Sequence, residues 1–380
     1  MMKNAKPSLS LLVSLLMFPQ IIETIYSPAL TDITRHFSVS AADGGQTLSI
    51  YFIAFALGVV FWGRLCDVLS RRAAMLGGLL CYAAGVFLAV YAEDFALFMV
   101  ARALAAFGAS VGSIVTQTVL RDSFTGSALG KVYAHMGIAI AISPVIGFLA
   151  GGLLTAWSGY QAVLWLLCML ALALLCWSGI SLPETRPATR HRESLWQSLA
   201  KLATDGQLWG HAALVALFNI ILFSYYSLAP FLFQQLGLST QVFGYSGLLL
   251  GGAAFIGGLI NKRIVAKGTA HRKVVWLGIL SSAMGAVGVI ALQGTLAFLI
   301  PVVLVVAGFG LVIPNVLSVA LKNYQPIVGT AGAWLGLQYY LMIGVGLWLA
   351  SISQNYGLTL IVCVVLAILV QSRLKTDDNI

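Results

Sequence analysis

Residues 19–30 read PQIIETIYSPAL and complete the first long apolar segment of the chain, residues 9–30. This stretch contains Glu23, the only carboxylate inside any of the long apolar segments. An ionised carboxylate in hydrocarbon costs about 2.5 kcal/mol or more on insertion scales. Such a group is therefore expected to have a water-filled cavity, a cationic partner or a bound proton. We take Glu23 as the candidate proton-handling group of the protein, around which the other segments build a cavity.

The composition predicts a polytopic membrane protein. Of 380 residues, 60% are hydrophobic and only 9% are charged, whereas soluble domains carry about 25% charged residues. A membrane span needs about 20 mainly apolar residues. Twelve segments meet this requirement: 8–30, 45–65, 73–92, 95–119, 132–156, 160–182, 208–235, 240–260, 274–293, 295–320, 330–353 and 356–372. The longest polar interval separates the first six from the last six.

The basic residues predict the orientation. With the N-terminus inside, 19 of the 21 Lys and Arg residues fall in inner segments, Arg35 alone lies in an outer loop, and Arg102 lies inside a span. This bias places both termini in the cytoplasm. It also explains the net charge of +9 without a nucleic-acid partner, and the basic face should attract anionic lipid. The run after Lys3 and Lys6 resembles a signal peptide, but it continues too far and is interpreted as an uncleaved first span.

A weak internal repeat predicts two related halves. The stretch GRLCD, residues 63–67, follows the second span, and GGLIN, residues 257–261, follows the eighth. We therefore predict an all-α membrane protein of two parallel six-helix halves. The halves are residues 1–183 and 208–380, joined by a cytoplasmic linker, 184–207. The five cysteines form no Cys-x-x-Cys pair, so no disulfide, metal or other cofactor is expected.

Glu23 and Arg102 are predicted to lie at similar depth. Glu23 lies seven residues before the end of the first span, and Arg102 lies seven residues after the start of the antiparallel fourth span. At about 1.5 Å per residue, both are about 10 Å from the outer surface. We expect them to face one cavity, so that the protonation of Glu23 depends on the state of that cavity. The alternative is a fixed ion pair that only joins the two spans.

The loop after the second span contains Gly63, Asp67, Arg71 and Arg72. Asp67 is too close to the surface to be the transport acid. It is instead expected to pair with Arg71 or to accept hydrogen bonds from a helix N-terminus. Asp122, at the inner end of the fourth span, could join this pairing. The alternative is a solvated basic loop that only sets the topology.

The fifth span contains Pro144, Gly147, Gly151 and Gly152. Proline removes a backbone donor and glycine permits close helix contact, so the segment is either a bend or gate against a neighbouring span, or ordinary small-residue packing. Aromatic and polar side chains are candidates for the substrate cavity, with helix packing as the alternative for each. They are Tyr26, Asn219, Tyr225, Tyr226, Gln338 and Tyr339.

At these residues the chain resembles the major facilitator superfamily, and more narrowly the Bcr/CflA-type (EmrD-like) drug-resistance transporters. The stretch 63–72 resembles the superfamily's loop 2–3 signature, Arg102 with Gly108 resembles the fourth-span signature, and SPVIGFLAGG, residues 143–152, resembles the fifth-span antiporter signature. In the first span the acid stands one residue earlier than in the family, where Thr24 occupies the usual Asp position. One residue is about 100° of helix rotation, so either the longer Glu23 reaches the same cavity or it has another role.

The resemblance implies export of drug-like or metabolite molecules in exchange for protons, with Asp67 helping to close an inner gate against the eleventh span. We therefore expect a monomeric proton-coupled efflux transporter of the bacterial inner membrane that exports small, mostly apolar compounds. The alternatives are an exporter of a sugar or amino acid, and a polytopic membrane enzyme. The enzyme is disfavoured because the loop carboxylates are scattered and the inner loops have no His-rich or metal-spaced cluster.

Overall fold

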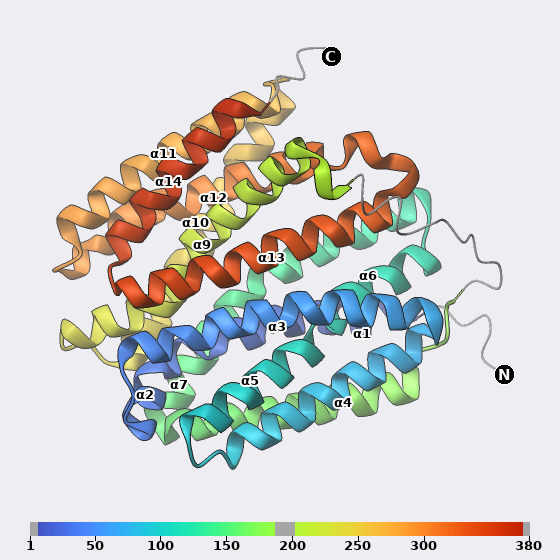
Figure 1. The fold of residues 1–380 in the computed structure, drawn as a ribbon, viewed down its shortest axis with the longest axis horizontal. Coiled ribbons are helices and arrows are strands. Elements are labelled where there is room, and N and C mark those ends of the chain that lie inside the picture. Colours follow the sequence, from blue (N-terminus) through green and yellow to red (C-terminus); the bar gives the residue numbers. More distant parts are fainter. Residues whose placement is uncertain (1–6, 187–201, 375–380) are drawn as a thin grey trace. The chain divides into compact units, whose positions relative to one another are not determined.

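A computed structural model describes residues 7–186 and 202–374 of the chain (Figure 1). Within these ranges every regular element is a helix. In chain order, the helices of the first half are α1 Leu9–Ile25, η1 Ser27–Ala29, α2 Leu30–Phe37, α3 Ala41–Val68, α4 Arg71–Val90, α5 Phe95–Ala109, α6 Val111–Ser123 and α7 Gly126–Ser181. The remaining helices are α9 Gly206–Gln235, α10 Thr240–Ala266, α11 His271–Leu292, η2 Leu296–Phe298, α12 Leu299–Ala320, η3 Lys322–Ile327, α13 Val328–Ser353 and α14 Tyr356–Arg373.

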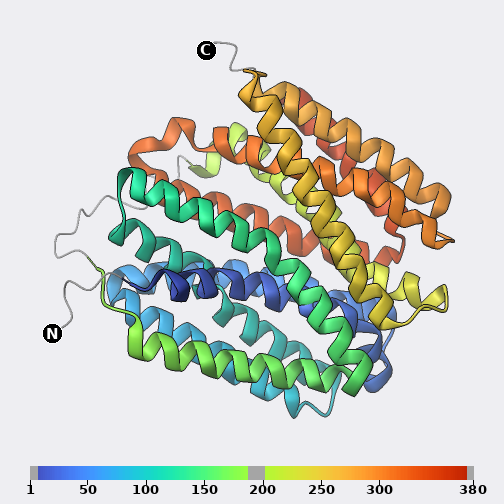
Figure 2. The same ribbon diagram turned by 180° about the vertical axis from the view of Figure 1, so that it is seen from behind.

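Eleven helical segments in the described ranges are long and apolar enough to cross a membrane. The longest of them, Met136–Ser181, has 46 residues. Its backbone leaves the helical conformation at Ser158 and at Gly159, where φ is +72°, a value that glycine adopts without a Cβ penalty. Figure 2 shows the two halves of α7, in green and yellow-green, meeting at one end. Because α7 supplies two of these spans, residues 7–186 and 202–374 contain twelve. The predicted all-α membrane fold is confirmed.

The first span extends beyond its predicted end. We expected it to stop at Leu30, but after the short η1 turn the helical segment continues through α2 to Phe37. Glu23 therefore lies deeper along this segment than the predicted seven residues. The fourth span is also divided, because α5 ends at Ala109 and α6 begins at Val111.

The chain divides into two compact units. The first comprises Met1–Ser40, Ile50–Arg192 and Thr240–Tyr245, and the second comprises Ala41–Ser49, Glu193–Ser239 and Ser246–Ile380. Residues 187–201 of the predicted linker 184–207 lie outside the described residues. The predicted division at 183 and 208 stays a prediction.

Glycines set the helix contacts inside each unit, and they occupy matching positions. A Cβ on Gly85 would lie 2.8 Å from Cα of Ala105, and one on Gly285 would lie 3.0 Å from the backbone nitrogen of Val305. The same offset of 200 relates Gly108, which faces the carbonyl oxygen of Gly78, to Gly308, which faces that of Gly278. Close α4–α5 and α11–α12 contacts are thus built from one repeated pattern of small residues.

The repeat exists, but in a different register from the one predicted. Gly58 faces the backbone carbonyl of Phe107, and Gly257 faces that of Ala307. The two glycines are therefore equivalent. GRLCD therefore does not align with GGLIN, because Asp67 then corresponds to Ala266. The helical backbone contact defines the register, whereas Gly and Leu are too common in apolar segments to define it by sequence.

Candidate functional site

Glu23 is buried in α1, with 4% of its surface exposed. Its Oε1 atom has no hydrogen-bond partner among the described residues. The neighbouring face of α1 packs on α7, where Gly147 lies against Thr24 and Gly151 against the backbone of Ile25. Thr24, at the family's usual Asp position, therefore faces the α7 glycines and donates its hydroxyl to the carbonyl of Gln20 at 2.8 Å. Glu23 is rotated from this face by about 100°.

Arg102 is buried in α5 and is 1% exposed. Its Cζ lies 3.5 Å from the ring centroid of Tyr26 and 5.4 Å from that of Tyr51. Its three guanidinium nitrogens have no hydrogen-bond partner in the described part of the chain. Arg102 and Glu23 interact electrostatically, yet no nitrogen–oxygen pair between them comes within the 4.0 Å of a salt bridge. The fixed ion pair considered from the sequence is therefore not formed in this structure.

Aromatic side chains from three helices surround these two groups. Tyr51 of α3 donates its hydroxyl to the carbonyl of Pro19 on α1 at 3.2 Å. Tyr82 of α4 packs edge-on against Phe18 at a centroid distance of 4.6 Å. These contacts fix the walls of the site, which combines one buried acid, one buried cation and several ring faces.

A second cluster joins the ends of α3, α4 and α6. Arg71, the first residue of α4, donates from Nη1 to Asp67 at 2.9 Å and from Nε to Asp122 at 2.8 Å. The same Nη1 donates to the carbonyl of Cys66 at 2.8 Å. Asp122 is 13% exposed and Asp67 is 53% exposed. The pairing predicted for Asp67, Arg71 and Asp122 is thus present in the structure.

Glu184, which was not predicted as a site residue, completes this cluster. Its carboxylate accepts hydrogen bonds from the backbone N–H groups of Arg71 and Arg72 at 3.1 and 3.3 Å, which places it at the N-terminus of α4. It also accepts from the backbone N–H of Arg186 at 2.9 Å. Burial alone would raise the pKa of Glu184, but these hydrogen bonds outweigh burial and hold it below its usual value. The N-terminus of α4 is therefore capped by Glu184 together with the Ser70 hydroxyl, which accepts from the backbone N–H of Ala73 at 2.9 Å, and not by Asp67.

The flanking residues of the cluster also make backbone contacts. Arg72 donates to the carbonyl of Gly179 on α7. Arg186 donates to the carbonyls of Val68 and Leu69 at 2.9 and 2.6 Å. Gly63, by contrast, lies against the side chain of Ile114 on α6. The stretch 182–186 thus fastens the end of α7 to the α3–α4 loop.

The sequence comparisons agree with this arrangement. The profile of the Major Facilitator Superfamily matches residues 12–347. The chain belongs to the major facilitator superfamily. Over 357 residues, 90% of this chain and 88% of the relative, it is 31% identical to an "Uncharacterized transporter" of Rickettsia bellii. It is 27% identical over 355 residues, 86% of this chain and 84% of the relative, to the "Multidrug resistance protein D" of Escherichia coli.

The solved structures agree on the fold. The crystal structure of a D-xylose-proton symporter superposes with a TM-score of 0.75 at 14% identity, covering 97% of this chain and 98% of that one. The protein is therefore a multi-pass membrane transporter of the major facilitator fold, and its family and structural neighbours are transporters rather than enzymes.

In this major facilitator protein, the fifth-span glycines are helix contacts. Gly147 and Gly151 pack on α1, and Gly152 lies against Gly244 within the first unit, where a Cβ on Gly152 would be 2.8 Å from Cα of Gly244. Pro144 lies inside α7, one residue after Ser143, whose hydroxyl donates to the carbonyl of Ala139 at 2.7 Å. The glycines hold α7 close to the helix that carries Glu23.

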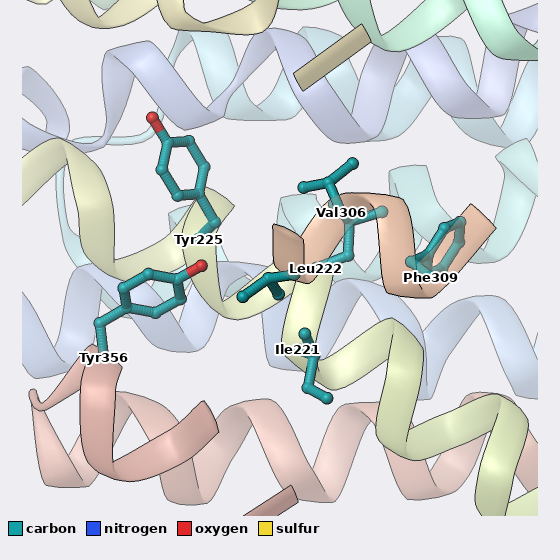
Figure 3. A pocket seen from close by; sticks show the side chains of 7 residues that line it. Ile221, Leu222, Tyr225, Val306, Phe309 and Tyr356 are labelled. Atoms are coloured by element: carbon teal, nitrogen blue, oxygen red, sulfur yellow. The ribbon is translucent and has the colours of Figure 1, made fainter. Parts of the chain in front are cut away.

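The second-half cavity candidates all belong to the second unit. Tyr225 donates its hydroxyl to Ser246 at 2.7 Å and packs against Tyr356 at 5.9 Å between centroids. Figure 3 shows these two tyrosines at one side of a small pocket whose other walls, including Ile221, Val306 and Phe309, are apolar. Tyr226 is buried and packs on Phe223.

The polar candidates have partners within their own unit. Asn219 donates to the carbonyl of Val215 at 2.7 Å. With the Gln338 amide turned to satisfy its neighbours, its oxygen accepts from the indole N–H groups of Trp209 and Trp334 at 3.2 and 3.1 Å. Tyr339 packs against the next residue, Tyr340, at 4.4 Å.

The second unit has its own cluster where α10, α11 and α12 meet. Asn315 donates to Asn261 at 2.6 Å, and its oxygen lies 2.7 Å from Nδ1 of His271. Because the Asn315 amide nitrogen also donates to the carbonyl of Leu311, its oxygen is left to accept, so Nδ1 of His271 is the donor. His271 is the first residue of α11, as Arg71 is of α4. This neutral cluster at the start of α11 was not predicted from the sequence.

Proposed function

We propose that this chain is a proton-coupled efflux transporter of the Bcr/CflA type, which exports small, mostly apolar compounds across the inner membrane of a bacterium. The observation that carries the proposal is the pair of buried ionisable side chains, the acid Glu23 and the base Arg102, which interact electrostatically but form no salt bridge. Buried ionisable groups in membrane spans mark ion or substrate pathways by default. The resemblance to a protein named for multidrug resistance supports the drug-like substrate class.

In the proposed cycle, Glu23 takes a proton from the outer side and releases it to the cytoplasm. One proton moving inward gains about 2.3 kcal/mol per 100 mV of membrane potential. Substrate and proton compete for the site, so each favours a different state of the transporter. Protons, the exported compound and membrane lipid are the partners of this cycle, and a monomer with both termini in the cytoplasm is sufficient for it.

The Arg71 cluster has a separate role in this proposal. Asp67, more than half exposed, contributes to closing the cytoplasmic side, while Asp122 and Glu184 hold the helix ends in place. Replacing Asp67 by Asn should slow conformational switching more than it weakens substrate binding. Equal losses of both would remove the gate role.

The test is proton release from the purified protein in detergent upon addition of ethidium, a flat lipophilic cation, or of candidate sugars and amino acids. Wild type is compared with Glu23→Gln and with the matched control Glu93→Gln, whose side chain is exposed before α5. We expect ethidium to release protons from wild type and from the control, but not from Glu23→Gln. Release by all three proteins would overturn the role of Glu23. If only a sugar or an amino acid released protons, that compound class would replace drug-like molecules as the proposed substrate.

A further inference from the structure

The buried guanidinium of Arg102 has two possible partners on one face of the first span, Glu23 in α1 and Tyr26 at the C-cap of α1. Tyr26 follows Glu23 by three residues, and residues three apart on a helix are neighbours, about 5–6 Å between Cβ atoms. The Arg102 guanidinium lies over the Tyr26 ring at 3.5 Å, one turn from Glu23. Glu23 interacts electrostatically with Arg102, so its carboxylate is the alternative partner to the ring.

The structure shows the ring-bound arrangement. The Arg102 nitrogens have no hydrogen-bond partner among the described residues, and Oε1 of Glu23 has none either. A buried ionised carboxylate beside a free guanidinium would be expected to pair with it, since a charge left unpaired in a low-dielectric interior is costly. The separation is therefore the arrangement expected for a protonated, neutral Glu23.

We infer that Tyr26 is a positioning residue that holds Arg102 away from Glu23 while Glu23 carries its proton, and that loss of the proton moves Arg102 from the ring to the carboxylate. This inference rests on the proposed role of Glu23 as the proton carrier. The proton leaves to water, and the ion pair replaces the cation–π contact. Because Arg102 belongs to α5, the protonation state of Glu23 thus changes a contact between α5 and the first span.

The other titratable groups around the site do not supply a competing charge. They are Tyr51 of α3, Tyr82 of α4 and Cys168 of α7, besides Arg102 of α5 and Tyr26 itself. All of these except Arg102 are neutral at physiological pH in their ordinary state. Arg102 is accordingly the cation whose position depends on the protonation of Glu23.

The cation–π contact between Arg102 and Tyr26 stabilises the protonated form of Glu23. This is because Arg102 must leave the ring in order to pair with the ionised carboxylate. Removing the ring face should therefore move the protonation midpoint of Glu23 to lower pH by about one unit, a tenfold loss of proton affinity that corresponds to about 1.4 kcal/mol. A loss of this size lies within the range of cation–π contacts.

The test is an infrared titration of the Glu23 carboxyl band, which is identified as the band missing from Glu23→Gln. It is applied to wild type, Tyr26→Leu, Tyr26→Phe and the control Tyr160→Leu, whose ring is buried in the same unit but packs on Phe37, outside the site. We expect a midpoint about one pH unit lower in Tyr26→Leu, and midpoints close to wild type in Tyr26→Phe and Tyr160→Leu. An unchanged or raised midpoint in Tyr26→Leu would overturn the inference. So would a full shift in Tyr26→Phe, which would assign the hold on Arg102 to the hydroxyl.

Fluorinated phenylalanines at position 26 provide a test that avoids a change of shape. Progressive fluorination weakens the ring's attraction for a cation while keeping its size, so the Glu23 midpoint should fall stepwise, and a flat series would overturn the inference. This titration needs no substrate. If Glu23 titrates as expected but no compound releases its proton, the proposed export function fails while the role of Tyr26 stands.

Discussion

Arg71 and Asp122, 51 residues apart in the sequence, are joined by a 2.8 Å hydrogen bond from Nε to a carboxylate oxygen. This bond connects the first residue of α4 to the last turn of α6. The Asp67 bond of the same guanidinium stays within the α3–α4 connection. The two carboxylates therefore contribute differently although both contact Arg71.

Asp122→Asn should destabilise the protein more than Asp67→Asn. Breaking a largely buried pair leaves an uncompensated charge and costs about 3 kcal/mol, whereas a half-exposed pair contributes about 0–1 kcal/mol. The measurement is the free energy of unfolding in mixed SDS micelles, monitored by tryptophan fluorescence. Equal losses for the two variants would show that exposure does not separate their contributions.

Glu184 should make stability depend on acidic pH. Its pKa lies below the usual 4.5 in the folded chain, so its ionised form stabilises the folded state fully above pH 4.5. That contribution is lost as pH falls from 4.5 through the folded-state pKa. Glu184→Gln should cost about 1 kcal/mol at pH 7, as for a lost helix cap, and the gap between the two proteins should narrow on acidification. A gap that widened at low pH would contradict the capping role.

Gly151 should not tolerate a side chain, whereas another glycine of the same helix should. A Cβ at position 151 would lie 3.1 Å from the carbonyl carbon of Ile25 and closer to its oxygen, while a Cβ on Gly137 meets nothing within 4 Å. Gly151→Ala should lower the thermal stability of the purified protein by separating α7 from α1. Gly137→Ala should leave the thermal stability unchanged or raise it, because Ala in a helix is more stable than Gly by about 0.5–1 kcal/mol of folding free energy. The comparison is made by size-exclusion chromatography after heating, and a matching response of the two variants would refute the contact.

Asn315 should be the central member of the second-unit cluster. It is 2% exposed and bonds to both Asn261 and His271. Asn315→Leu should cost about 1 kcal/mol, because it removes the hydrogen bonds that Asn315 makes to the half-buried Asn261 and to His271. His271→Ala should cost less, since His271 is an exposed residue at the helix start. The free energy of unfolding is measured in the same mixed SDS micelles. A larger loss in His271→Ala than in Asn315→Leu would contradict the central role of Asn315.

Some of the site was predicted residue by residue. The burial of Glu23 and Arg102 followed from their presence in apolar segments, and the pairing of Asp67, Arg71 and Asp122 followed from their shared end of the predicted bundle. Glu184 was not predicted, although the stretch LPETR, residues 182–186, carried the signal of an acid followed closely by a base. Its target, the free N–H groups of α4, is 113 residues away, and no local pattern specifies such a contact.

The all-helical membrane class can be read from the sequence, because hydropathy acts on each segment independently of the others. Three features could not be read from it: Arg102 lies on the ring of Tyr26 rather than on Glu23, the first span continues through α2 to Phe37, and Gly58 rather than Gly63 corresponds to Gly257. These features depend on how each helix is rotated about its axis. That rotation is set by side-chain and backbone contacts between segments far apart in the chain, and a uniformly apolar helix carries little sequence signal of it.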